Sequence, residues 1–247
     1  IRPTHGRISL ERVLALSPSL DTCGYFARDI DTFARVSAVL LNDDTAVLPA
    51  TVRLLKPLDM WAMLEEDVAK AQAAPLARVE AALGKAVDMQ VILDDSDTAY
   101  WSLRHIQGHE AWAVHGPFIE RYCPPLGPGI VERFTWSKTV TDAQMDAATT
   151  YRERFKKHLA ELLGTDGVLV MPTVADIAPL ISESGDRLES YRNRSIQMLC
   201  LAGLSGFPQI SMPLGQRLGA PLGLSLLGPA GSDRSLVRLA QRIASQS

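Results

Sequence analysis

Several features that mark whole classes of protein are missing from these 247 residues. No apolar run approaches the roughly 20 residues that a membrane-spanning helix needs, and no signal-peptide pattern follows Ile1. The net charge is only -3, so the chain lacks the basic surface that binds nucleic acid or an anionic membrane. We therefore expect neither nucleic acid nor a membrane as a partner.

Cysteine is also scarce. Cys23, Cys123 and Cys200 are far apart and odd in number, so they make neither a Cys-x-x-Cys pair nor a disulfide framework. This usage is typical of a reducing compartment, and we expect a cytoplasmic protein. No sequence feature marks a reactive thiol, so Cys23 and Cys200 are expected to be small buried apolar residues.

Motifs for cofactors and metals are missing as well. Neither a Gly-x-x-x-x-Gly-Lys-Ser/Thr loop nor a Gly-x-Gly-x-x-Gly turn occurs, so the sequence offers no loop that would cradle a phosphate. His105 and His109 have the i, i+4 spacing that lets two imidazoles on one helical face share a metal. Because the order His-Glu-x-x-His is absent and Gly108 weakens that helix, partly exposed histidines are the favoured interpretation, and we assign no metal ligand.

What the sequence does contain is the pattern of an α/β protein. Hydrophobic residues make up 47% and charged residues 21%, an ordinary globular composition for one large domain or two small ones. Strand, helix and strand character follow one another over residues 51–55, 61–83 and 89–93, which is typical of a βαβ unit. Val168–Met171 is a continuous apolar run, as in a strand buried on both faces. The expected fold is a mixed β-sheet covered by helices on both faces.

The remaining elements are predicted from periodicity and end signals. Asp29 and Thr141 are N-cap candidates, and Gly84 and Gly164 are stop signals. Helices are expected over residues 29–41, 61–83 with a break at Pro75, 98–120 with loosening at Gly108 and Gly116-Pro117, 141–163, a stretch ending near 203, and 232–244. Further strands are expected over residues 208–212 and 222–227, with a turn around Gly219-Ala220-Pro221 between them.

Ser205 is the sharpest candidate for a nucleophile. A nucleophile elbow needs a strand before the serine and a glycine two residues after it, because the chain turns sharply there and packs closely. Phe207 holds the place of that glycine, and a helix precedes the serine. The favoured interpretation is a helix-terminating Ser-Gly turn. An unrelated α/β hydrolase that uses Ser205 with a histidine is kept as an alternative.

Four segments, in order and spread over nearly the whole chain, are similar to the carboxy-terminal portion of the amidase-signature family. Ile1–Ser9 resembles the family's Lys-Pro-Thr-x-Gly-Arg-Val-Ser stretch, and Ser19–Arg28 resembles Ser-Leu-Asp-x-x-Gly-Pro-x-Ala-Arg with tyrosine in place of proline. Asp166–Thr173 resembles the family's buried strand that ends in Pro-Thr. Leu201–Pro229 resembles the successive motifs Leu-Ala-Gly-Leu-Pro, Val-Pro-x-Gly and Gly-Leu-Gln-Leu-Ile-Gly-Pro, with cysteine in place of the asparagine that precedes them.

This resemblance implies an enzyme that hydrolyses the carbon–nitrogen bond of a small-molecule amide, without metal or cofactor, by a Ser/cis-Ser/Lys mechanism. A neutral lysine takes the nucleophile's proton through the second serine, and backbone N–H groups stabilise the oxyanion. In the family these groups lie upstream of the Pro-Thr-x-Gly-Arg motif. No Ser-Ser-Gly-Gly run occurs here and no lysine has a matching context, so no catalytic residue is assigned. Glu110–Trp112 and His115–Phe118 further resemble indole-acetamide hydrolases.

The chain opens at Ile1 rather than at a methionine. We expect residues 1–247 to be the carboxy-terminal portion of a single amidase-signature domain, inactive alone, with the missing amino-terminal half of the same enzyme as its partner. A homodimer is a further assembly compatible with this expectation. The alternative is a diverged or truncated, non-catalytic module for binding or assembly.

Candidate substrate-binding residues lie at the carboxyl end of the apolar strand and in the helical middle, since ligands of open α/β sheets bind beyond the carboxyl ends of strands. They are Trp112, His115, Met171, Pro172, Thr173 and Asp176. A structural role is the alternative for each, with Trp112 in the core and Pro172-Thr173 as a strand terminator. Asp21 and Arg28 are expected to form a structural pair around a turn.

Overall fold

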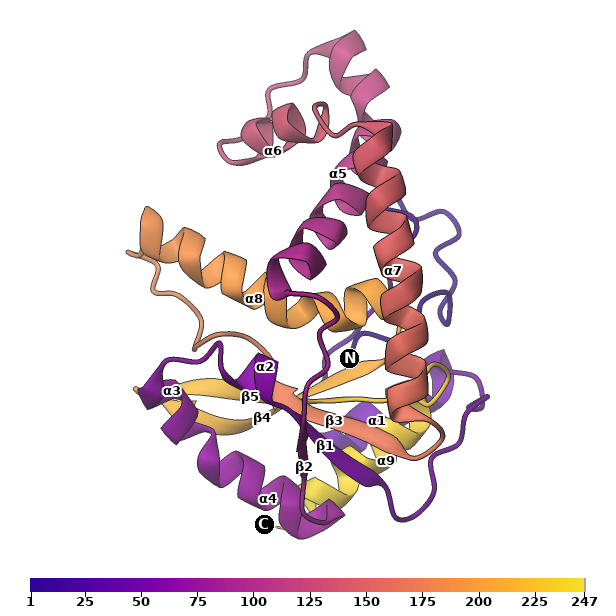
Figure 1. Ribbon diagram of the computed structural model, residues 1–247, viewed down its shortest axis with the longest axis vertical. Coiled ribbons are helices and arrows are strands. Elements are labelled where there is room, and N and C mark those ends of the chain that lie inside the picture. Colours follow the sequence, from indigo (N-terminus) through magenta and orange to yellow (C-terminus); the bar gives the residue numbers. More distant parts are fainter. Residues whose placement is uncertain (247) are drawn as a thin grey trace.

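Residues 1–246, which the computed structural model describes, contain one five-stranded sheet in the order β2-β1-β3-β5-β4 (Figure 1). The neighbouring strands β2, β1 and β3 run parallel, whereas β5 is antiparallel to both β3 and β4. The sheet is therefore mixed, as predicted. The strands are β1 (Arg53–Pro57), β2 (Val87–Met89), β3 (Gly167–Pro172), β4 (Gln209–Arg217) and β5 (Ala220–Leu227).

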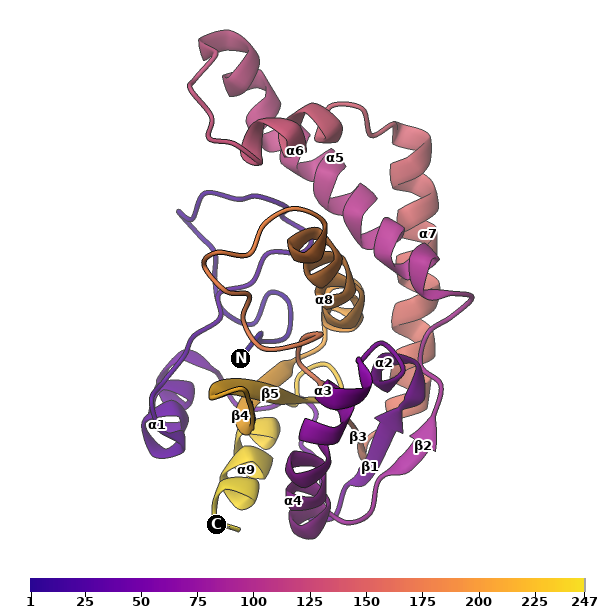
Figure 2. The same ribbon diagram turned by 90° about the vertical axis from the view of Figure 1, so that its left-hand side faces the viewer.

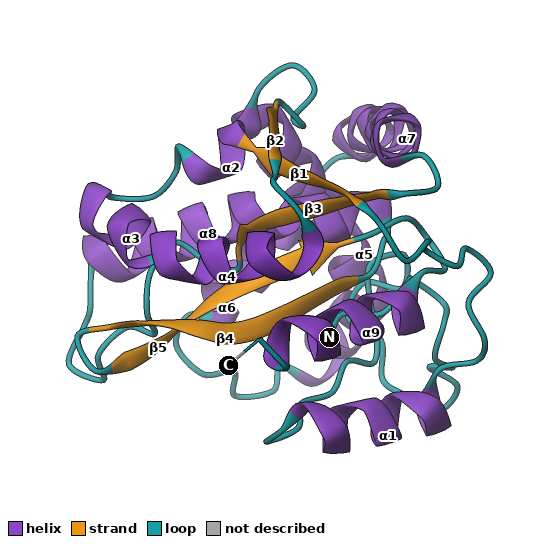
Figure 3. Cartoon of the chain, turned by 90° about the horizontal axis from the view of Figure 1, so that it is seen from below, coloured by secondary structure: helices purple, strands orange, loops and turns teal. Residues whose placement is uncertain are grey.

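Helices cover both faces of this sheet, which confirms the expected α/β architecture. On one face lie α4 and α9, with α1 beside α9, and on the other lie α8, α7 and α5 (Figures 1 and 3). In Figure 2, α6 and the far end of α5 lie above α8 and the sheet, and α7 runs beside them down to the level of the sheet. The helices are α1 (Ile30–Leu40), α2 (Leu58–Trp61), α3 (Glu66–Ala71), α4 (Ala73–Leu83), α5 (Ser96–Tyr122), α6 (Ile130–Ser137), α7 (Asp142–Leu163), α8 (Asp186–Ser205) and α9 (Asp233–Ala244).

Strand β3 separates two apolar cores. Every residue of β3 is buried, and successive side chains point to opposite faces of the sheet. Val168 and Val170 join the core beneath α4 and α9, whereas Leu169 and Met171 join the core formed with α5, α7 and α8. The continuous apolar run in the sequence is thereby explained, because a strand with a core on each side has no polar face.

Local end signals place several helices where the sequence predicts them. Asp29 caps α1 by accepting the N–H of Thr32 at 2.7 Å. Thr141 and Gln144 form a reciprocal capping box at the start of α7, and Gly164 follows its last residue. The ends of α7 agree with the prediction because both signals are local in sequence.

Other predicted boundaries are wrong. The expected buried strand over residues 89–93 is instead the three-residue edge strand β2, whose first two residues are exposed. The helical stretch expected over residues 61–83 is interrupted at residues 62–65 and again at Gln72, while Pro75 sits in the first turn of α4, where a helix tolerates proline. Strand β1 continues through Pro57 rather than ending before Lys56.

Helix α5 runs unbroken for 27 residues, although the sequence predicts loosening at two glycines. A Cβ on Gly108 would lie 2.6 Å from the ring of Trp136, and one on Gly116 would lie 2.7 Å from the ring of Trp112. These glycines let indole rings pack against the helix rather than interrupting it. Trp136 belongs to α6, a helix that the sequence does not predict.

The amino-terminal segment lies along the outer edge of the sheet. Arg2 and Gln209 exchange backbone hydrogen bonds of 2.8 and 2.9 Å, which makes an isolated antiparallel bridge beside β4. Beyond this bridge the segment loops away without forming a strand. The contact brings residues from the two ends of the sequence to one place.

Candidate functional site

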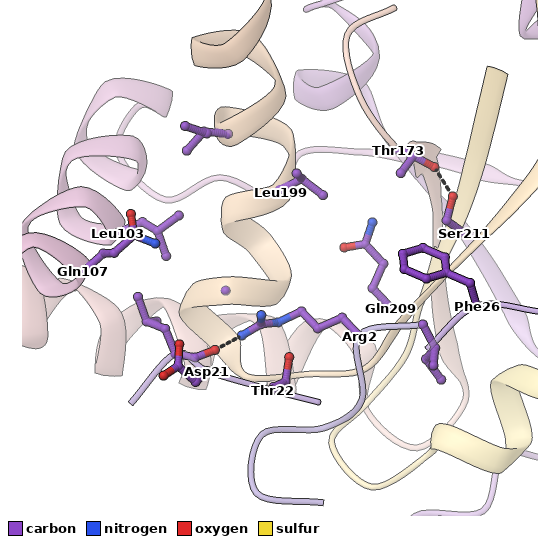
Figure 4. A pocket seen from close by; sticks show the side chains of 14 residues that line it. Arg2, Asp21, Thr22, Phe26, Leu103, Gln107, Thr173, Leu199, Gln209 and Ser211 are labelled. Atoms are coloured by element: carbon purple, nitrogen blue, oxygen red, sulfur yellow. Dashed lines mark hydrogen bonds between the residues drawn. The ribbon is translucent and has the colours of Figure 1, made fainter. Parts of the chain in front are cut away.

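A cavity of about 580 Å³ opens where the amino-terminal segment, α5, α8 and β4 meet (Figure 4). In this view, Thr173 and Ser211 lie on one side and Leu103 lies on the other, with Arg2 between them. The cavity adjoins the carboxyl end of β3. It is thus in the place where the sheet topology predicts a ligand site.

Three hydroxyl groups form a cluster beside this cavity. Thr173 Oγ1 lies 2.7 Å from Ser211 Oγ and 2.8 Å from Ser225 Oγ, so the threonine that follows β3 is linked to residues within β4 and β5. Gly223 provides the space for the Thr173 hydroxyl, because a Cβ there would lie 2.7 Å from Thr173 Oγ1. A hydroxyl both donates and accepts hydrogen bonds, so this cluster offers either a donor or an acceptor to an amide or carboxyl group.

Arg2 holds the amino-terminal wall of the cavity in place. Its Nη2 donates to the Leu20 carbonyl at 2.6 Å, and it packs near Arg152, whose guanidinium donates to Ser19. Burial chiefly lowers the pKa of Arg2 from its ordinary value, and the charge of Arg152 acts in the same direction. The bound carbonyl and the bridge to Gln209 keep this cation fixed at the cavity wall.

The opposite wall is apolar. Leu103 of α5 and Ile196 and Leu199 of α8 line it, and Phe26 stands at the rim with 98% of its surface exposed. Gly203 permits the close crossing of α5 and α8, because a Cβ there would meet Leu103 at 2.8 Å. The site therefore pairs an apolar wall with a polar end at the sheet.

The structure brings one of the six predicted substrate-binding residues, Thr173, to the lining of this cavity. Met171 and Pro172 are buried in the sheet below it. Asp176 lies in a different cavity of about 610 Å³, where Arg217 donates to both of its oxygens at 3.0 and 2.9 Å.

Trp112 and His115 lie further along α5, outside the lining of the 580 Å³ cavity. The ammonium of Lys138 sits 5.3 Å from the ring centre of Trp112. His115 Nε2 lies 2.8 Å from the Ala15 carbonyl oxygen, and its ring meets Phe134 edge-on. In the described chain these two side chains contact protein neighbours that belong to α6 and to the loops beside it.

Sequence reasoning missed Gln209, Ser211, Leu103 and Gln107, all of which line the cavity. The two residues of β4 carry one usable signal, because alternate polar residues in a predicted strand share one face. The residues of α5 carry none. Their place depends on how α5 crosses α8, which is a tertiary contact.

Ser205 is no nucleophile elbow. Its hydroxyl donates to the Leu201 carbonyl at 2.6 Å and accepts the N–H of Phe207 at 3.1 Å, and it is buried at the end of α8. Gly206 follows with φ +70°, so the predicted helix-terminating turn is confirmed.

The predicted histidine pair is divided between two environments. His105 packs in a three-ring cluster with Trp101 and Trp136, whose ring centres lie 5.6 and 6.3 Å from its own, and burial lowers its pKa. His109 Nε2 lies 2.9 Å from a carboxylate oxygen of Asp142. Among residues 1–246, no group of three or more His, Cys, Asp or Glu side chains is arranged to hold a metal ion.

Two structural expectations are wrong. Cys23 is exposed rather than buried, whereas Cys200 is buried, and burial raises the pKa of its thiol to about 12. Asp21 does not pair with Arg28. Its carboxylate accepts the backbone N–H groups of Leu16 at 2.8 Å and Ser17 at 3.0 Å, which closes a local turn instead.

Comparison with known proteins agrees with this fold. Residues 130–237 match the Amidase family. Amidase 1 of Oryza sativa subsp. japonica is 30% identical over 98% of the chain, and outer envelope protein 64, chloroplastic, of Arabidopsis thaliana is 26% identical over 97%. A crystal structure of an amidase superposes with a TM-score of 0.85 at 22% identity over 99% of the chain. By sequence and by fold, the chain is similar to the amidase family over nearly its whole length.

The chain spans only part of these proteins. It covers 62% of Amidase 1, 45% of the outer envelope protein and 57% of the crystallised amidase chain. Within the described residues, no helix has the length and apolar character needed to cross a membrane.

Proposed function

We propose that this chain is the carboxy-terminal portion of an amidase that hydrolyses the carbon–nitrogen bond of a small-molecule amide. The observation that carries the proposal is the 30% identity to Amidase 1 over 98% of the chain, together with the shared amidase fold. The cavity beside β3 has the composition that such a substrate needs. Its hydroxyls suit the amide group, and its apolar wall suits the rest of the molecule.

The catalytic groups of this amidase would come from outside these 247 residues. The resemblance to the family implies a serine, a cis serine and a lysine upstream of the segment that begins at Ile1. In support of this, the described residues that line the 580 Å³ cavity include no Lys, His or Cys, and their one carboxylate, Asp21, already accepts two backbone N–H groups. Both N–H groups donate to the same oxygen of Asp21, so its second oxygen is the one carboxylate acceptor left in this lining, and a lysine or histidine general base would have to come from outside the described lining residues.

The remaining portion of the enzyme is the proposed partner, and the outer edge of the sheet is where it docks. In residues 1–246, only the single bridge between Arg2 and Gln209 continues the ladder beyond β4, so the edge presents free backbone groups. Phe26 stands nearly fully exposed at the rim of the cavity on the same side. Added strands would complete the sheet and cover this ring, and they would bring the catalytic groups to the cavity.

The experiment begins with the intact mass of the polypeptide that carries this sequence, purified from cells that express its gene. Ammonia release is then measured with phenylacetamide and propionamide. We expect a longer chain, or two associated chains, that releases ammonia. A folded longer chain that releases none from any amide would contradict the proposal.

A non-catalytic module for assembly is the second candidate. One observation favours it: a relative that matches 97% of the chain is an outer envelope protein of the chloroplast, which its name describes by location rather than by a reaction. This candidate predicts a longer protein that folds, binds a protein partner and leaves amides intact. The ammonia assay therefore separates the two candidates.

We further propose a cytoplasmic location. The three cysteines are free in the structure, and two of them, Cys23 and Cys123, are exposed without a disulfide partner. Exposed free thiols persist in a reducing compartment. Cell fractionation checks the proposal, which recovery of the protein in an organelle envelope would contradict.

A further inference from the structure

A second cleft lies between α5, α6 and the amino-terminal half of α8. Its volume is about 280 Å³, and Ile196 lines both this cleft and the 580 Å³ cavity, so the two are neighbours along α8. In Figures 1 and 2, α6 stands off the sheet beside α5, on the far side of α8 from the strands. One elongated ligand could therefore lie along α8 from the sheet to α6.

The lining of this cleft carries more positive than negative charge. Arg104, Arg133 and Arg192 face two glutamates, which leaves a formal charge of +1. Glu132 is occupied, because it accepts a backbone N–H at the start of α6 at 2.6 Å. Glu189 approaches Arg192 only at 3.9 Å. A ligand with a single negative charge would balance the lining.

The guanidinium of Arg104 packs against an aromatic ring and has no hydrogen-bond acceptor within the described part of the chain. Its guanidinium carbon lies 4.8 Å from the ring centre of Trp136, which in turn stacks on His105. Its Nε is buried and has no hydrogen-bond partner in residues 1–246, and no carboxylate or carbonyl in that range is paired with its other nitrogens. A buried N–H without a partner costs free energy, so this side chain is positioned to gain from an acceptor supplied by a ligand.

Neutral donors accompany the arginines. The Tyr100 hydroxyl donates to Asn193 Oδ1 at 3.0 Å, and both residues line the cleft. With Oδ1 engaged, the Nδ2 hydrogens of Asn193 are the donors that remain for a ligand. A planar guanidinium beside an amide NH₂ matches the two oxygens of a carboxylate.

The neighbouring surface limits where an anion can sit. A cavity of about 410 Å³ adjoins the cleft around Trp101, and it carries Asp97, which accepts from Gln197 at 3.1 Å. An anion would be repelled from that side. The favourable position is thus at the α6 end, between Arg104 and Arg133.

We propose that this cleft binds a carboxylate, and that the amide substrate of the complete enzyme carries a carboxylate at the end remote from its amide. This inference rests on the proposed function and names its substrate class. The carboxylate meets Arg104 and Arg133, the apolar body lies along Ile196 and Leu199, and the amide reaches the hydroxyl of Thr173.

Binding to the 247-residue chain tests the site without any need for activity. Calorimetry compares adipic acid monoamide with hexanamide, which has the same six-carbon chain and amide but no carboxylate. We expect the monoamide to bind at least about tenfold more tightly, and Arg104→Gln and Arg133→Gln each to remove about that factor. Arg35→Gln, on α1 at the other face of the sheet, serves as the matched control and should change nothing.

The exposed side chain of Arg133 makes no hydrogen bond or ion pair within the described residues, so its substitution should leave the fold intact. Equal affinity for the two ligands, or full affinity in both cleft variants, would overturn the inference.

In the complete enzyme, kcat/KM should favour the monoamide over hexanamide by about tenfold, and Arg104→Gln should abolish this preference. Hydrolysis of both amides at the same kcat/KM would refute the carboxylate site while leaving the amidase proposal intact. Binding of the carboxylate without hydrolysis of either amide would support the carboxylate site and refute the amidase proposal.

Discussion

Thr4 and Asp233, which are 229 positions apart in the sequence, are joined by two hydrogen bonds. The Thr4 N–H donates to one carboxylate oxygen at 2.7 Å, and the Thr4 hydroxyl donates to the other at 2.6 Å. The same hydroxyl accepts the N–H of Gly231 at 2.9 Å. The threonine of the Pro-Thr-x-Gly-Arg-like segment thus ties the amino-terminal wall of the cavity to the start of α9.

Asp233→Asn should lower the free energy of unfolding by about 2 kcal/mol, because Asp233 is fully buried and an amide cannot accept both hydrogen bonds. Asp31→Asn is the matched control, since Asp31 is an exposed aspartate in the first turn of α1. Urea unfolding followed by circular dichroism measures both. Equal losses for the two variants would show that the Thr4 contact contributes nothing.

Gly231→Ala should destabilise the chain more than Gly219→Ala. Both glycines have positive φ, +81° and +80°, so both variants carry the backbone cost of about 1 to 2 kcal/mol. Only at Gly231 would the new Cβ collide with a neighbour, 2.0 Å from Thr45 Oγ1. Thermal unfolding should therefore show a larger loss for Gly231→Ala, and identical midpoints would contradict the close contact between the two loops.

Cys200 should resist alkylation in the folded chain. Burial raises the pKa of its thiol from 9.0 to about 12, so at pH 9 the folded protein keeps this thiol protonated while the unfolded chain ionises it. The folded state consequently loses stability as the pH rises from about 9 towards 12. Iodoacetamide at pH 9 should modify two cysteines in the native chain and all three in urea, by intact mass. Modification of three in the native chain would refute the burial of Cys200.

Thr173→Val should cost about 1 to 2 kcal/mol of stability, because it keeps the branched shape and leaves the Ser225 hydroxyl buried without its partner. Thr150→Val, at an exposed position whose hydroxyl bonds only within α7, should cost much less. Chemical unfolding compares the two variants. A similar cost for both would mean that the hydroxyl cluster contributes no stability.

The parts of the fold that local signals govern could be predicted, and the others could not. Helix α7 agrees because Thr141 and Gly164 mark its ends in the sequence, and β3 agrees because burial on both faces leaves an unbroken apolar run. Helix α5 differs because the space beside Gly108 is filled by Trp136, a residue 28 positions away whose approach no local pattern reveals.

In the candidate site too, positions set by local signals could be predicted and positions set by tertiary contacts could not. Thr173 follows the end of a recognisable strand, so its position could be predicted from topology. Trp112 and His115 lie elsewhere on α5, because the cavity wall is set by the crossing of α5 and α8 at Gly203. Arg104 gave no signal in the sequence, since its lack of an acceptor appears only once α6 is in place.

Ammonia release by the purified 247-residue chain tests the central claim most directly, namely that these residues form the substrate-binding portion of an amidase without its catalytic groups. The chain should be folded by circular dichroism and should release no ammonia from phenylacetamide, propionamide or adipic acid monoamide above the rate in buffer. Sustained release that disappears in Ser205→Ala, or in another serine variant of this chain, would contradict the claim, because the nucleophile would then lie within it.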